Sequence, residues 1–304
     1  PLPQTMSDPP DLYDSIILRN NCFFVIFIIN LNDNPDKFLK NIFTMSSAPV
    51  LTQCLSYLTM PIISRIFSPS MFGVFNLYTS IVDPLGSIST LGYHQAIILP
   101  KQEKDADRLF FLSILLGLIL CFLLIAVLFI LKFFQIKIAN FDSIQPFLWL
   151  IPISVFLHTL SVILSSWNQR HAHFVIIAIS KVISIIVNKG ALLTFGFIGM
   201  ASGEFLIIGL LLGSITVVLF QGFNFLRKAY FSFTNIKVLY LKNLLSKYKN
   251  FPLYVMTSDL LFRITNSLVI IFMVYFFSDE IAGLYGMALM IAGVPSILIG
   301  SAIG

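Results

Sequence analysis

The chain has 304 residues, of which 57% are hydrophobic and only 11% are charged, and its mean hydropathy is +0.91. Soluble domains carry about 25% charged residues, so these few charges exclude a soluble protein of this length. The formal net charge of +5 does not indicate nucleic-acid binding, because the basic residues cluster at the ends of apolar segments, as in membrane proteins.

The apolar residues occur in blocks long enough to cross a bilayer core of ~30 Å. They predict an all-α fold, a polytopic membrane helix bundle with about eight helices. The expected segments are 42–66, 71–98, 109–131, 146–167, 172–195, 202–226, 251–276 and 281–304. Ser68 followed by Pro69 predicts the start of the second helix, and Ser278 followed by two acids predicts the start of the eighth.

Residues 1–37 read unlike the rest of the chain. Five acids fall within 1–36, and the apolar run 22–31 is too short to span a bilayer. This run also lacks the charged start and the small-residue cleavage site of a signal peptide. We interpret 1–37 as a tail or an upstream extension that does not belong to the membrane fold.

The connection 227–250 predicts the orientation in the membrane, since it carries six basic residues and no acid. Such a loop is retained on the cytoplasmic side. Alternation of the segments then places the N-terminus in the cytoplasm and divides the basic residues twelve against three in favour of that side. Leu241, Leu244, Leu245 and Tyr248 share one helical face within this connection. That face predicts an amphipathic helix on the membrane surface.

The sequence contains an internal repeat. Residues 67–75 align with 277–285 at a constant offset of 210, and Ile81 then falls on Ile291. A unit with an even number of crossings repeats in parallel, about an axis along the membrane normal. We therefore expect two six-helix lobes around a central cavity: a first lobe at 38–226, a basic linker at 227–250, and the first two helices of a truncated second lobe at 251–304.

The second segment carries polar residues at spacings of three and four, which predict one polar face along a helix. They are Asn76, Ser80, Asp83, Ser87, Thr90 and His94. Such a face is either a packing interface between helices or the wall of a water-filled cavity. The acid near the middle of the span favours the cavity, because an ionised group in the bilayer core is costly.

In the seventh segment, Asp259 precedes Arg263 by four residues, the favourable order for an ion pair on one helix, and Asn266 follows. The pair either neutralises itself for insertion or supplies a guanidinium that binds phosphate. In the fifth segment, Lys189 lies deep enough to face a cavity. His158 lies on a polar face of the fourth segment, and we interpret it as a packed core residue.

Three stretches carry a resemblance to a known family: PIISRIFSPSMFGVFNLYTSIVDPLGSISTLGYHQAIILPK at 61–101, KYKNFPLYVMTSDLL at 247–261 and IAGLYGMALMIAGVPSILIGSAIG at 281–304. Residues 38–304 resemble the Wzx-type polysaccharide flippases of the multidrug/oligosaccharidyl-lipid/polysaccharide exporter superfamily. The resemblance implies twelve helices in two lobes and alternating access. It also implies export of an undecaprenyl-diphosphate-linked oligosaccharide across the bacterial inner membrane, for surface polysaccharides such as the O-antigen of lipopolysaccharide. The lipid-linked oligosaccharide, membrane lipids and a polysaccharide polymerase are the partners that it implies.

From these residues we expect a cavity with excess positive charge between the lobes. Arg263 and Lys189 attract the diphosphate, and three further residues contact the substrate: Asn266, Asn76 and His94. The carboxylates orient these bases or take up a coupling H⁺ or Na⁺; they are Asp83 and Asp259.

Two other classes remain open. A drug or cation antiporter of the same superfamily shares the architecture but favours an acidic cavity. An enzyme such as a membrane polymerase or glycosyltransferase needs paired carboxylates in a large outer loop. The longest expected outer loop, 132–145, holds only Lys132, Lys137 and Asp142 as charged residues. The sequence contains no nucleotide-binding motif, and its three cysteines have no metal-ligand spacing, so we expect a transporter without cofactor or metal.

Overall fold

The computed structural model describes residues 35–134, 142–228 and 244–303. All regular structure in these ranges is helical, which confirms the predicted all-α membrane bundle. The elements are α3 (Pro35–Ile66), α4 (Pro69–Ile88), α5 (Tyr93–Ala96), α6 (Glu103–Phe133), the 3₁₀ helix η1 (Asp142–Leu150), α7 (Ile151–Arg170), α8 (Phe174–Phe197), α9 (Gly203–Lys228), the π-helix η2 (Phe251–Met256), α11 (Thr257–Phe276) and α12 (Asp279–Ile303). Residues 44–304 form one compact unit, which contains all the helices from α4 to α12.

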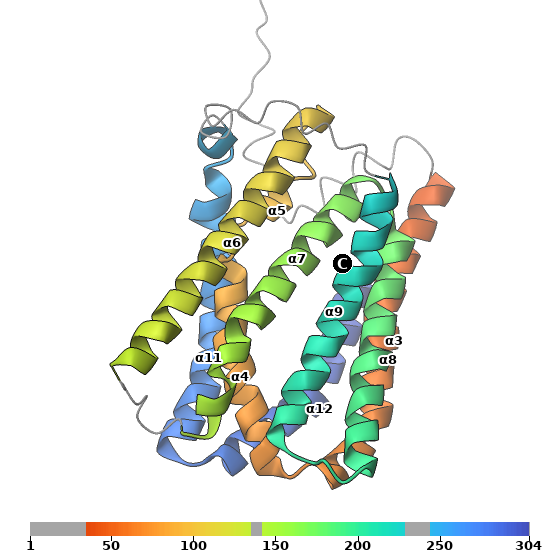
Figure 1. Ribbon diagram of the computed structural model, residues 1–304. Helices are drawn as coiled ribbons and strands as arrows, with labels where there is room; N and C mark the ends of the chain where they lie inside the picture. Colours follow the sequence, from red (N-terminus) through yellow and green to blue (C-terminus); the bar gives the residue numbers. More distant parts are fainter. Residues whose placement is uncertain (1–34, 135–141, 229–243, 304) are drawn as a thin grey trace, which may run out of the picture. The chain divides into compact units, whose positions relative to one another are not determined.

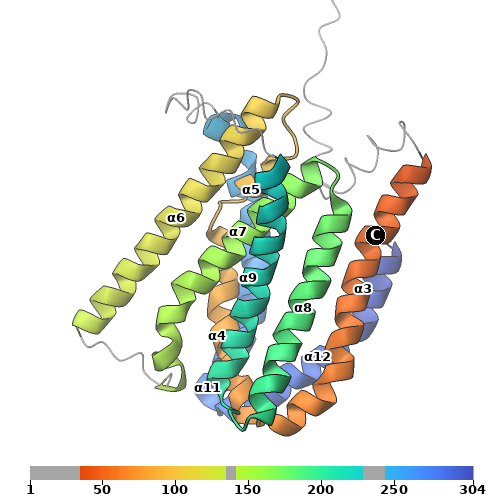
Figure 2. The ribbon, with the colours of Figure 1, turned by 45° about the vertical axis from the view of Figure 1, so that its right-hand side comes forward.

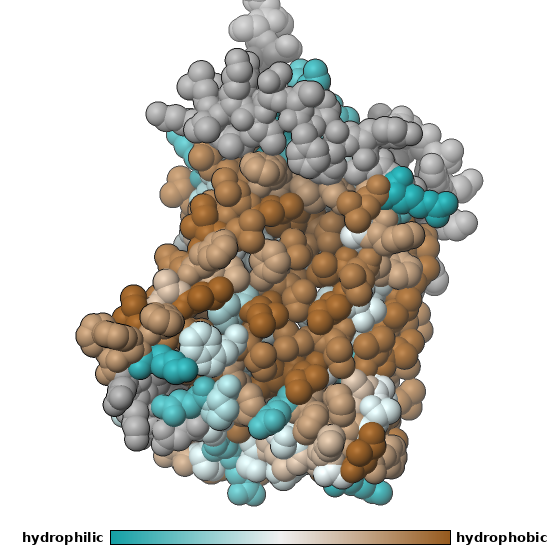
Figure 3. Space-filling model, viewed as in Figure 1, coloured by the Kyte–Doolittle hydropathy of each residue, from teal (hydrophilic) through white to brown (hydrophobic). Residues whose placement is uncertain are grey.

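Each of the eight predicted segments contains one long helix, and the second, fourth and seventh also include a short helical element. Five of the helical stretches are long and apolar enough to cross a membrane: Glu103–Phe133, Ser143–Arg170, Phe174–Phe197, Gly203–Arg227 and Phe251–Phe276. Large apolar side chains of α6 are exposed along its length, including Phe122, Phe129 and Phe133. In Figure 3 the visible face is largely hydrophobic between its two ends. A continuous apolar surface of this kind is suited to contact with lipid rather than water.

The second segment is not one helix over 71–98, as the sequence predicts. α4 ends at Ile88, and Leu91 and Gly92 adopt φ values of 49° and 75° before α5 begins. The hydroxyls of Ser87 and Ser89 donate to the carbonyls of Pro84 and Gly86, and such side chains compete with the helical backbone bonds. His94 therefore lies on a separate short helix and does not continue the polar face of α4.

The helices alternate in direction, so their connections gather at two ends (Figures 1 and 2). One end contains the turn from α5 to α6, the turn from α7 to α8, the end of α9 and the start of η2. Eight basic residues occur at these helix ends and connections. They are Lys101, Lys104, Arg108, Arg170, Arg227, Lys228, Lys247 and Lys249. At the other end the described basic residues are Arg65 and Lys132. We call these the basic end and the opposite end.

The internal repeat is present in the helix boundaries. α3 ends at Ile66 and α11 ends at Phe276, while α4 begins at Pro69 and α12 begins at Asp279. Each pair differs by the same 210 residues that align the two sequences. Ser278 caps the second copy through its hydroxyl, which accepts a bond from the Ile281 N–H at 3.3 Å.

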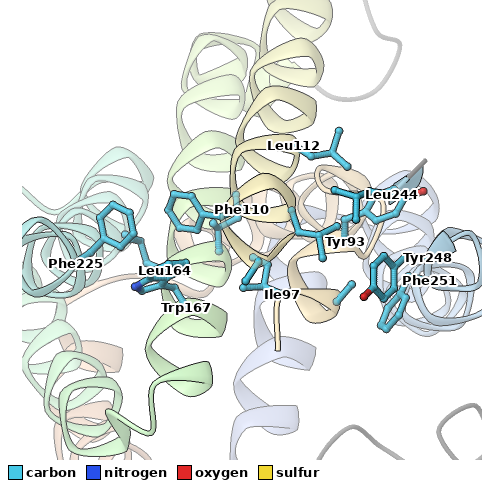
Figure 4. Packing of buried hydrophobic residues seen from close by; sticks show 14 residues of the cluster. Tyr93, Ile97, Phe110, Leu112, Leu164, Trp167, Phe225, Leu244, Tyr248 and Phe251 are labelled. Atoms are coloured by element: carbon cyan, nitrogen blue, oxygen red, sulfur yellow. The ribbon is translucent and has the colours of Figure 1, made fainter. Parts of the chain in front are cut away.

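A hydrophobic core lies at the basic end, where α5, α6, α7, α9 and the residues before η2 meet (Figure 4). Phe110 stacks on Phe225 with ring centroids 4.7 Å apart, and Trp167 meets Phe110 edge to face at 5.3 Å. Leu244 and Tyr248 are buried in the same core. The described part of the linker therefore packs its apolar face on the bundle, so that face is not free to contact lipid; the beginning of the linker, 229–243, lies outside the described residues.

Polar side chains join α7, α8 and α9 within the apolar bundle. Gln221 of α9 is fully buried, accepts a bond from the Ser165 hydroxyl at 3.1 Å, and donates to the Ser180 hydroxyl at 2.8 Å. One turn further on, Asn224 donates to Asn168 at 2.8 Å. Interhelical hydrogen bonds of this kind help membrane helices to associate, because the hydrophobic effect does not favour helix–helix contact over helix–lipid contact.

Candidate functional site

Five ionisable side chains gather where α4, α5, α7 and α11 approach one another. They are Asp83, His94, His158, Asp259 and Arg263, and we call them the mid-span cluster. At a rise of 1.5 Å per residue, Asp83 and Arg263 each lie ~20 Å along their helices from the opposite end. They are therefore well inside a bilayer core of ~30 Å, where ionised groups are rare and tend to be functional.

Arg263 and Asp259 form an ion pair on α11, in which Nε of Arg263 donates to Oδ2 of Asp259 at 3.0 Å. The side chains are 32% and 40% exposed, so the guanidinium keeps further donors available. The acid lies one turn before the base, as the sequence predicts. The pair thus presents a partly neutralised guanidinium in the middle of a spanning helix.

Asp83 lies on α4, and Arg263 of α11 is the charged group that interacts with it electrostatically. The two helices pack against each other, so this interaction joins the two halves of the repeat. Asp83 is exposed in the described part of the chain. Arg263 therefore pairs with a carboxylate on its own helix and interacts electrostatically with a second carboxylate, on α4.

His94 reaches the cluster from α5. Its Nδ1 is 2.6 Å from the Thr90 hydroxyl, and the ring interacts electrostatically with His158, Asp259 and Arg263. The break after α4 changes the direction of the chain, yet it keeps His94 beside Thr90. His94 is thus close to Thr90, although it lies on α5 and not on a continuous second helix.

His158 of α7 belongs to the cluster, although its sequence context predicts a packed core residue. Its ring packs on Gly86 of α4, where a Cβ atom would lie 2.8 Å from Nδ1. Nδ1 is buried and has no hydrogen-bond partner among the described residues. The ring also interacts with Arg263 and Asp259. The sequence around His158 does not predict its place in the cluster, because its contact is with Gly86, which lies 72 positions earlier on another helix.

The other candidate residues lie elsewhere. Asn266 is exposed, and its amide donates to the Phe262 carbonyl on its own helix at 2.8 Å. Asn76 is buried, and its amide donates to the Ala282 carbonyl of α12 at 3.3 Å. Lys189 is half-buried on α8, and none of the ion pairs formed by the described residues includes it. Lys189 is also not among the charged groups that act on Asp83, His94 or His158, whereas Arg263 acts on all three, so the structure does not place Lys189 in the mid-span cluster.

The charge of the mid-span cluster differs from the expected excess of positive charge. With neutral histidines, it holds two carboxylates and one guanidinium. The histidines and carboxylates of the cluster do not form a metal site, since no group of three or more such side chains in the described ranges is arranged to hold a metal ion. In this arrangement, Arg263 can donate hydrogen bonds to an oxyanion. The two carboxylates can take up a cation, which would free Arg263 from its interactions with them.

The comparison with known families matches residues 38–304 to the family described as polysaccharide biosynthesis protein. No curated protein and no solved structure matches this chain. The matched range includes every described helix that contributes to the mid-span cluster. It also begins one residue after the tail at 1–37, whose composition sets it apart from the rest of the chain. The chain therefore belongs to the polysaccharide biosynthesis protein family of multi-pass membrane proteins.

Proposed function

We propose that this chain moves an undecaprenyl-diphosphate-linked oligosaccharide from the cytoplasmic to the periplasmic leaflet of the bacterial inner membrane. The observation that carries the proposal is Arg263, a guanidinium in the middle of a spanning helix that pairs with Asp259 and interacts electrostatically with Asp83 on α4. Family membership supports a role in making polysaccharide, and the spanning helices support transport over soluble chemistry.

The energetic problem in this reaction is the headgroup, because a diphosphate with its sugars is strongly hydrated and cannot enter the apolar core unaided. A charged side chain in the bilayer core also costs ~2.5–3.5 kcal/mol on insertion scales. Arg263 and the diphosphate would offset each other's cost within a water-filled passage. The lipid tail needs no such path and stays in the bilayer.

In the proposed mechanism, Arg263 exchanges partners. The planar guanidinium binds phosphate oxygens through two parallel donors, in competition with Asp259 and Asp83. When the diphosphate takes Arg263, Asp259 loses its ion-pair partner and Asp83 loses the positive charge that acts on it, while the negative charge of the site increases. The two carboxylates would then take up H⁺ or Na⁺, and this uptake couples substrate binding to an ion gradient.

Alternating access completes the cycle. The basic end, with eight basic residues at its helix ends and connections, is cytoplasmic by the positive-inside rule, which also places the N-terminus in the cytoplasm. Rocking of the two lobes would expose the mid-span cluster first to that side and then to the periplasm.

Reconstitution in vesicles tests the proposal. Vesicles that contain the protein and a labelled undecaprenyl-diphosphate oligosaccharide in one leaflet are probed with a sugar-degrading reagent that cannot cross the membrane. We expect protein-dependent transfer, reduced at least about tenfold by Arg263→Ala and unchanged by Arg227→Ala at the exposed end of α9. Transfer no faster than in protein-free vesicles would overturn the proposal.

A second candidate is a cation or drug antiporter of the same architecture. The specific observation in its favour is the charge of the mid-span cluster, where two carboxylates face one guanidinium. Such an excess of acid attracts a cation more readily than a diphosphate. Vesicles loaded with a cationic dye distinguish the two, because an antiporter extrudes the dye against an ion gradient while the labelled lipid stays in place.

A further inference from the structure

α4 and α12 cross at two glycines that make matching contacts. A Cβ atom on Gly73 would overlap the carbonyl oxygen of Asp279, and a Cβ atom on Gly283 would overlap the carbonyl oxygen of Pro69. In each case the contact is with backbone, which cannot swing away as a flexible side chain can. Only glycine allows two helices to approach this closely.

The two contacts are equivalent, because the offset of the internal repeat relates their residues. Gly283 is Gly73 plus 210, and Asp279 is Pro69 plus 210, so each glycine of one copy meets the first helical residue of the other. A reciprocal contact of this kind is what a two-fold relation produces at its axis. The local axis relating the two halves therefore passes between Gly73 and Gly283.

The crossing lies near the opposite end of the bundle. Each glycine is the fifth residue of its helix, about 6 Å along the axis from the first residue. One turn deeper, Asn76 donates to the Ala282 carbonyl at 3.3 Å and covers Gly286. Asn76, Ala282 and Gly286 are all buried, so the contact continues inward from the glycines.

We propose that Gly73 and Gly283 form a seal that closes the periplasmic end of the passage in this structure, and that the seal parts when the transporter opens outward. This rests on the proposed function for the existence of a passage. The glycines let the helix backbones touch without intervening side chains. The closed state is thus held by backbone packing and by the Asn76 bond. The carboxylate of Asp279 lies at this contact, and its buried Oδ1 has no hydrogen-bond partner among the described residues, so it would gain hydration when the contact breaks.

The first test uses an added methyl group. Ser80→Cys places a thiol one turn beneath Asn76 on α4 and leaves the Asn76 bond intact, because Ser80 is buried and its hydroxyl bonds only Leu77 of its own helix; Cys22, Cys54 and Cys121 are replaced by Ser in this background. The thiol is probed from the periplasmic side with a maleimide that cannot cross the membrane. Gly73→Ala and Gly283→Ala each force the helices apart, and labelling is expected to become about tenfold faster.

Gly190→Ala is the matched control, because it lies within α8 and nothing lies within 4 Å of its Cβ position. It should label at the parent rate. Equal labelling rates for Gly283→Ala and Gly190→Ala would overturn the proposal.

A second test leaves both sealing glycines in place and so does not depend on whether their variants insert. Asn76→Cys combined with Gly286→Cys puts two thiols on facing turns, since the Cβ position at Gly286 is 2.7 Å from Cγ of Asn76. Mild oxidation of membranes should link the two positions within one chain, and absence of the link would overturn the proposal. Neither readout uses a substrate, so failed lipid transfer with intact labelling and cross-linking would contradict the proposed function alone.

Discussion

The guanidinium of Arg263 is held by Asp259, one turn earlier on α11, while Asp83 acts on it from α4. A pair that served only to neutralise charge during insertion would be complete within α11. The additional carboxylate comes from the other half of the repeat, so the carboxylates that surround Arg263 depend on how α4 and α11 approach. This dependence is what a transporter needs if substrate binding is to alter the contact between its lobes.

The membrane orientation gives the simplest prediction. Cysteine at Lys101, in the turn before α6, should react with a permeant but not with an impermeant maleimide applied outside intact cells. Cysteine at Ser278, in the turn before α12, should react with both. The native cysteines are replaced in both variants, and each variant serves as the control for the other. Reversed accessibility would contradict the orientation and move the glycine seal to the cytoplasmic side.

Arg170 is predicted to hold the basic end together. Its side chain is 8% exposed, and its Nη1 reaches the carbonyls of Ile97 at 3.1 Å and Pro100 at 2.8 Å, while Nε and Nη2 donate to Glu103. Lysine cannot reproduce this fork, so Arg170→Lys should destabilise the protein by about 1–3 kcal/mol.

Thermal unfolding in detergent measures the effect of Arg170→Lys. The control is Arg227→Lys, because Arg227 is exposed. If the two variants unfold at the same temperature, the bonds made by Arg170 contribute nothing net.

Gln221 is predicted to stabilise the first lobe independently of transport chemistry. Gln221→Ala removes both interhelical bonds and leaves Ser165 and Ser180 without their amide partner. Single interhelical bonds in membranes average ~0.6 kcal/mol, so a loss of about 1–3 kcal/mol is expected once the cavity is included. Thr216→Ala is the matched control, because Thr216 is only partly buried and its hydroxyl bonds its own helix, at the Leu212 carbonyl. Equal losses of stability in the two variants would show that the α7–α8–α9 network is dispensable.

Long-range patterns in the sequence predict the fold well. Blocks of apolar residues locate the helices because span length is set by the bilayer, and the repeat at an offset of 210 locates equivalent helix starts. Gly73 and Gly283 already stand at equivalent positions in that repeat. That they touch is not predictable from the repeat, since a repeat fixes equivalence but not which copies pack together.

Local patterns predict the site less completely. The spacing of Asp259 and Arg263 predicts their ion pair because both residues lie on one helix. The polar stripe from Asn76 to His94 assumes an unbroken helix, and the left-handed residues at 91 and 92 end that periodicity. His158 joins the site through its contact with Gly86. A single contact between two helices does not produce a periodic pattern in the sequence of either helix, so the sequence does not predict it.

Paired removal of charge on α11 tests the role of Arg263 most directly. Lipid transfer is measured in vesicles for Arg263→Ala and for the double variant Arg263→Ala with Asp259→Ala, which removes both partners of the ion pair and so leaves the charge on α11 balanced. If Arg263 binds the diphosphate, both variants insert and both lose transfer by at least about tenfold. Recovery of normal transfer in the double variant would show that the ion pair only neutralises itself in the membrane, and would contradict diphosphate binding by Arg263.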